Sequence, residues 1–86
     1  MSTSRAAELA PVVEAAQRVA GALAARGRGD HAGAREMLAS FDEPTELAGG
    51  ALLVAELTLA LLSTSTGESL DECVRDLCVT LERSLT

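Results

Sequence analysis

The sequence contains no lysine, tryptophan, tyrosine or isoleucine, and it has one histidine, one phenylalanine and two cysteines among 86 residues. Without lysine there is no side-chain amine for Schiff-base chemistry and no flexible polybasic tract. The single histidine, His31, leaves no HxxxH or HExxH pair, and no CxxC spacing exists. Neither a zinc-type ligand set nor a nucleophile with its base can be assembled. The sequence therefore predicts a protein that is not an enzyme and has no cofactor and no metal site.

Positive charge is scarce: 7 basic residues, all arginine, stand against 13 acidic ones, which gives a net charge of -6. The excess lies in the second half, because residues 44–86 contain 2 arginines and 7 acids. Aromatic side chains that could stack on bases are almost absent. This balance disfavours nucleic acid as a partner.

Two features bear on location. Cys73 and Cys78 are five residues apart on one expected helix, beyond disulfide reach, and unpaired thiols are typical of a reducing compartment. The most apolar stretch, Leu47 to Leu62, has 16 residues, contains Glu56 and is shorter than the ~20 needed to cross a bilayer. No signal peptide is recognised. We therefore expect a cytoplasmic protein without a membrane span.

What is abundant is alanine, with 16 residues, and leucine, with 14. Both are strong helix formers, and apolar residues recur at spacings of three and four. The sequence predicts one all-α domain over residues 1–86, a four-helix domain of two antiparallel hairpins with residues 1–4 frayed. The helices are expected at Ser4 to Arg26 (bent at Pro11), Asp30 to Phe41, Thr45 to Ser63 and Ser69 to Leu85.

Connections are expected where helix-ending signals cluster. Gly27 is predicted to take a left-handed conformation after the first helix, and Ser63 to Gly67 to form a turn. Ser69 with Glu72 three residues later predicts a capping box.

The stretch ELAGGALLVAELTLALLS, Glu46 to Ser63, is the expected centre of the domain. Its apolar content predicts a helix buried on most of its circumference, with Leu52 and Leu59 facing the core. The pair Gly49-Gly50 has two interpretations: the helix starts nearer Ala51, or another backbone approaches closely.

A homodimer is the expected assembly, because four helices in so short a chain cannot surround this central helix. The predicted interface comprises Gly49, Leu53, Glu56, Ala60 and Val79. The alternative is that the hairpin of the first two helices covers this strip within one chain.

Three local motifs suggest other interpretations. The stretch ALAARGRGDHAGAREML, from Ala22, is similar to the turn of a tetratricopeptide repeat, which implies a helical hairpin. Gly67-Glu68-Ser69-Leu70-Asp71 resembles the attachment region of acyl carrier proteins, which implies a phosphopantetheine arm on Ser69, although Glu68 replaces the usual Asp. Arg26 and Arg28, before a helix N-terminus, are candidates for binding an anion.

The function predicted from the sequence is that of a small, acidic, non-catalytic protein–protein interaction module. The alternatives are a carrier-type protein modified on Ser69 and a weak DNA- or anion-binding regulator acting through Arg26 and Arg28.

Overall fold

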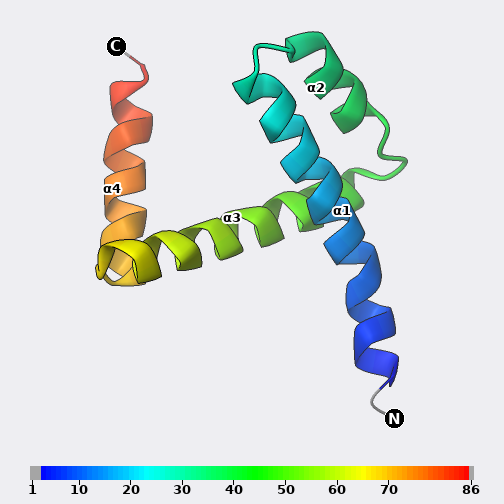
Figure 1. Cartoon of the computed structure of the whole chain (residues 1–86), viewed down its shortest axis with the longest axis horizontal. Coiled ribbons are helices and arrows are strands. Elements are labelled where there is room, and N and C mark those ends of the chain that lie inside the picture. Colours follow the sequence, from blue (N-terminus) through cyan, green and yellow to red (C-terminus); the bar gives the residue numbers. More distant parts are fainter. Residues whose placement is uncertain (1–2, 86) are drawn as a thin grey trace. The chain divides into compact units, whose positions relative to one another are not determined.

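The computed structural model describes the backbone of residues 3–85 and the side chains of residues 7–85. It contains four helices, α1 (Thr3–Gly27), α2 (His31–Ala39), α3 (Pro44–Thr66) and α4 (Leu70–Arg83), and no strand within this range (Figure 1). The prediction of an all-α fold with four helices is confirmed. Of the four residues expected to fray, Met1 and Ser2 lie outside the described residues, whereas Thr3 and Ser4 belong to α1.

The chain divides into two compact units, Met1–Val54 and Ala55–Thr86, with the division inside α3. We call them the N-terminal unit and the C-terminal unit and describe each by itself. The expectation of a single domain stays a prediction.

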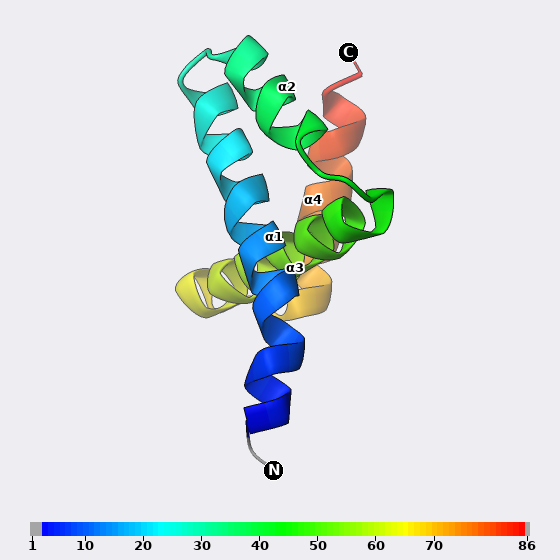
Figure 2. The ribbon, with the colours of Figure 1, turned by 90° about the vertical axis from the view of Figure 1, so that its right-hand side faces the viewer.

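In the N-terminal unit, α2 folds back alongside α1 (Figures 1 and 2). The contact is made by small side chains. Ala22, Ala25 and Ala34 are each 1% exposed, and Leu38 packs against them. Alanines keep the two backbones close, because they add almost no side-chain volume to the contact. The contact between α1 and α2 is thus built from methyl groups, and the expected arrangement of two antiparallel hairpins stays a prediction.

The turn between α1 and α2 differs in detail from the prediction. Gly27 is the last residue of α1, and it is Gly29 that has a positive φ, of 86°. Asp30 N–H donates to Ala25 O at 2.9 Å, and the Asp30 carboxylate accepts from Gly33 N–H at 2.9 Å. The left-handed residue comes later than expected because two more residues are needed to reverse the chain before Asp30 caps α2.

The segment after α2 is held against α1 by Arg18. Its guanidinium donates to Ser40 Oγ at 2.5 Å and lies 3.9 Å from the centroid of the Phe41 ring. Phe41 was expected inside the second helix, but α2 ends at Ala39 and Ser40 is its C-cap. The cation–π contact holds the ring outside the helix.

Gly50 is where α3 meets α1. It is buried, and a Cβ atom built on it would lie 2.7 Å from the carbonyl carbon of Ala15. Because α3 begins at Pro44, the helix does not start near Ala51, and the second interpretation of the glycine pair is correct: another backbone approaches closely. α1 itself is one helix that contains Pro11.

The prediction that the central helix is buried on most of its circumference is wrong. Gly50 is the only buried residue of α3, whereas Leu52, Leu57 and Leu61 are 61%, 57% and 72% exposed. Leu59 is half-buried, so the expected core-facing leucines are not in a core. Within the described residues the buried side chains are mainly alanines, with Val19 and Cys73, and four leucines of α3 are exposed: Leu52, Leu57, Leu61 and Leu62.

In the C-terminal unit α3 continues to Thr66, so that four of the five residues of the expected turn at Ser63 to Gly67 are helical. The hydroxyl groups of Thr64 and Thr66 donate to the carbonyls of Ala60 and Leu62, four residues earlier, so these polar residues extend the helix. Gly67, with a φ of 77°, then ends it. The second hairpin, of α3 with α4, stays a prediction.

The predicted capping box at the start of α4 is confirmed. Glu72 N–H donates to Ser69 Oγ at 3.2 Å, and Ser69 N–H donates to a Glu72 carboxylate oxygen at 2.9 Å. The structural role proposed for Ser69 as the cap of a helix is therefore fulfilled.

Candidate functional site

The most regular apolar surface of the chain lies on α4. Side chains spaced four, three and four residues apart fall on one helix face, and each is 39–57% exposed: Leu70, Val74, Leu77 and Leu81. We call these four residues the α4 seam. Alternating steps of three and four are the spacing with which two helices pair along a shared stripe.

The surroundings of the α4 seam fit a pairing surface. The charged residues of α4, at positions 71, 72, 75, 76, 82 and 83, follow the seam residues by one or two positions, which places them on the flanks and the opposite side of the helix. Cys73, next to the seam, is 1% exposed. The seam is thus an apolar stripe with its charges turned away.

The part of α3 in the C-terminal unit carries further apolar surface, at Leu57, Leu61 and Leu62. By length and composition α3 could cross a membrane, and 6% of its most apolar window is buried inside the structure. The apolar stretch Leu47 to Leu62, with 16 residues, was expected to be too short to cross a membrane. The helix that contains it, α3, has 23 residues. Glu56 remains the residue that opposes such a span.

The five residues predicted for the dimer interface fall in both units. Gly49 lies in the N-terminal unit and is half-buried; a Cβ atom built on it would lie 3.7 Å from a Val12 methyl group. Leu53, in the same unit, is also half-buried. In the C-terminal unit Glu56, Ala60 and Val79 are exposed. Val79 lies two residues from both Leu77 and Leu81, and so on the face of α4 away from the seam.

Acidic groups gather at the beginning of α4. The charge of Asp76 raises the pKa of Glu68, helped by burial, by the charge of Glu72 and by a hydrogen bond with Asp76. The pKa of Glu72 is lowered, because its carboxylate accepts hydrogen bonds from the backbone and side chain of Ser69, against a smaller effect of burial. These shifts reflect the cap and its neighbours, and the cluster contains no cation.

A pocket of about 360 Å³ opens between the end of α1 and the start of α2. It is lined by Arg26 from α1 and by His31, Ala34, Arg35 and Leu38 from α2. Arg28, the second residue predicted for anion binding, is exposed in the turn and is not among the lining residues. His31 and Arg35 were not among the site residues predicted from the sequence, although their spacing of four residues places them on one face of α2.

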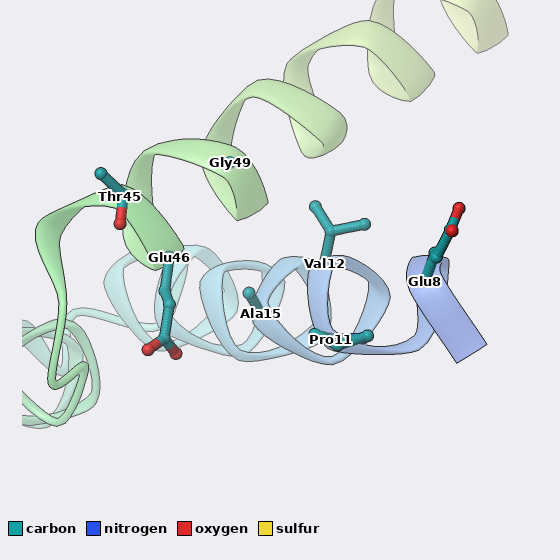
Figure 3. Close-up of a pocket in the computed structure, with 7 residues that line it drawn as sticks. All are labelled: Glu8, Pro11, Val12, Ala15, Thr45, Glu46 and Gly49. Carbon is teal, nitrogen blue, oxygen red and sulfur yellow. The ribbon is translucent and has the colours of Figure 1, made fainter. Parts of the chain in front are cut away.

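A second pocket, of about 240 Å³, lies between α1 and the first turns of α3 (Figure 3). Pro11, Val12, Ala15 and Gly49 form its apolar part, and the carboxylates of Glu8 and Glu46 lie toward its two ends in the view. The carboxylates point in different directions, so they do not form a paired acid–base site.

Both cysteines are free, with Cys73 buried and Cys78 exposed. Within the described residues, no three His, Cys, Asp or Glu side chains gather closely enough to hold a metal ion.

Comparison of the chain with protein-family models, with curated proteins and with solved structures gave no match.

Proposed function

We propose that this protein is a non-catalytic, cytoplasmic interaction module that works as a homodimer. The observation that carries the proposal is the exposure of the α4 seam together with Leu57 and Leu61 of α3, in the same C-terminal unit. Large apolar patches on the surface of a small protein commonly mark sites of contact with a partner.

A second copy of the chain is the occupant that the α4 seam fits. Its spacing of 4-3-4 residues repeats with the period of a helix-pairing stripe, and two identical stripes related by a two-fold axis are complementary to each other. The C-terminal unit contains 2 arginines and 6 acids, so two copies repel each other over long range. Because the charges lie away from the seam, salt screens this repulsion without weakening the apolar contact.

Sedimentation equilibrium at micromolar concentration tests the proposal, with Leu77→Glu and Val79→Glu as a matched pair. The two side chains are 43% and 41% exposed but lie on different faces of α4. We expect the wild type to sediment as a dimer, Leu77→Glu as a monomer and Val79→Glu as a dimer. If Val79→Glu alone dissociates the dimer, the interface lies on the strip of Glu56, Ala60 and Val79 that the sequence predicts.

A wild type that is monomeric at all accessible concentrations would overturn the homodimer. Flotation with phosphatidylcholine vesicles examines the membrane alternative for α3. Co-flotation that persists in Leu77→Glu would assign the apolar surface to a bilayer and refute a soluble dimer.

A further inference from the structure

We propose that the pocket between α1 and α2 is a binding site for a small, multiply charged anion of the phosphate class, with Arg26, His31 and Arg35 as its ligands. The proposal is independent of dimerisation, because every lining residue belongs to the N-terminal unit. It also changes the composition of the site expected from the sequence, since His31 and Arg35 take the place of Arg28.

The lining of the pocket has an apolar part and a part made of nitrogen-bearing side chains. Ala34 is 1% exposed and Leu38 is half-buried, and these two provide the apolar part. Arg26, His31 and Arg35 complete the lining; they are exposed and come from two different helices. The apolar part also belongs to the alanine contact between α1 and α2, so the elements that carry the three nitrogen-bearing side chains are fixed relative to each other.

No internal partner competes for these groups. Arg26, His31 and Arg35 make no salt bridge or side-chain hydrogen bond within residues 7–85. Asp30, next to His31, and Glu36, next to Arg35, are the acids nearest in sequence. The Asp30 carboxylate accepts from Gly33 N–H as the cap of α2. By contrast, Arg18 in the same unit contacts Ser40 and Phe41.

The chemistry of the ligands defines the class of anion. A guanidinium group donates two parallel hydrogen bonds to phosphate oxygens, and two such groups with an imidazole match an anion that has several oxygens and more than one charge. A long polyanion fits less well, because the N-terminal unit contains 5 arginines against 7 acids and its surface outside the pocket would repel a backbone of phosphates. A volume of about 360 Å³ suits a phosphate or diphosphate group.

The test is a nuclear magnetic resonance titration of ¹⁵N-labelled protein with inorganic pyrophosphate, against sodium chloride at equal ionic strength. We expect saturable shifts at the amides of α2 and of Arg26. Arg35→Gln and Arg26→Gln should each weaken binding by about tenfold or more, the effect of losing a charged hydrogen bond. Arg28→Gln, which removes the same charge outside the pocket, should change the affinity less than about twofold.

Arg35→Lys keeps the positive charge but removes the planar guanidinium that donates two parallel hydrogen bonds. We expect this variant to bind pyrophosphate more tightly than Arg35→Gln and less tightly than the wild type. Circular dichroism of each variant checks that the helices are intact, and all three positions are exposed. Equal losses in Arg28→Gln and Arg35→Gln would overturn the site, because they would indicate attraction by net charge alone. Shifts that never saturate would overturn it as well.

Discussion

At the scale of single residues, two adjacent glycines of α3 have different environments. A Cβ atom on Gly50 would lie 2.7–2.9 Å from backbone and Cβ atoms of Ala15, whereas one on Gly49 would meet a Val12 methyl group at an ordinary 3.7 Å. Moving the Ala15 backbone aside costs free energy because the helix must shift with it, whereas a contact of 3.7 Å with the Val12 methyl group is favourable. The pair is therefore a matched test of the contact between α1 and α3.

We predict that Gly50→Ala destabilises the fold by about 1–2 kcal/mol, because overpacking outweighs the gain in helix propensity. Gly49→Ala should instead stabilise it by about 0.5–1 kcal/mol, since only the entropic penalty of glycine is removed. Urea unfolding at one fixed protein concentration measures both. Shifts of the same sign in the two variants would refute the close approach at Gly50.

At the scale of elements, the capping box determines where α4 begins. We predict that Ser69→Ala costs about 1 kcal/mol in free energy of unfolding, the usual loss of an N-cap side chain. Ser65→Ala is the control, because Ser65 is exposed in α3 and caps no helix. A loss in Ser65→Ala as large as in Ser69→Ala would remove the cap as the explanation.

The cap also predicts a pH dependence. The pKa of Glu72 is lower in the folded protein than its ordinary 4.5, so its contribution to stability is present above that value and is lost as the pH falls through the folded pKa. The pKa of Glu68 is raised, so its ionisation destabilises the fold as the pH rises through the folded pKa, above 4.5. Thermal midpoints should therefore fall for Glu72→Gln and rise for Glu68→Gln at pH 7. Both differences should disappear well below pH 4.5, and a difference that persists there would contradict the assignment.

The helices themselves could be predicted from the sequence, but several of their ends could not. The three-four spacing of apolar residues and the Ser69–Glu72 pair locate α4 to within one or two residues of its observed bounds. The end of α3 was predicted too early, because the composition of Ser63 to Thr66 is typical of a loop. In the structure the hydroxyl groups of Thr64 and Thr66 donate to carbonyl groups of the preceding helical turn. Such bonds depend on side-chain geometry, which composition does not specify.

At the scale of the whole molecule, an apolar composition proved a poor guide to what is buried. The large leucines of α3 suggested a core, yet the buried residues are mainly alanines of α1 and α2. Periodicity identifies an apolar face, but it does not say whether that face meets its own chain or another one. The anion pocket illustrates the same difficulty, since Arg35 joins Arg26 only when α2 folds back on α1.

The alanine interior also determines how stability should respond to temperature. Ala15, Ala16, Ala22, Ala25 and Ala34 bury little apolar area, and the heat capacity of unfolding scales with that area. A monomer should therefore unfold with a heat-capacity change below the usual ~12–15 cal/mol/K per residue, so its stability curve should be broad and flat. Pairing of the α4 seams adds buried apolar area. Calorimetry should accordingly give a larger heat capacity per chain for the wild type than for Leu77→Glu, and a midpoint that rises with wild-type concentration.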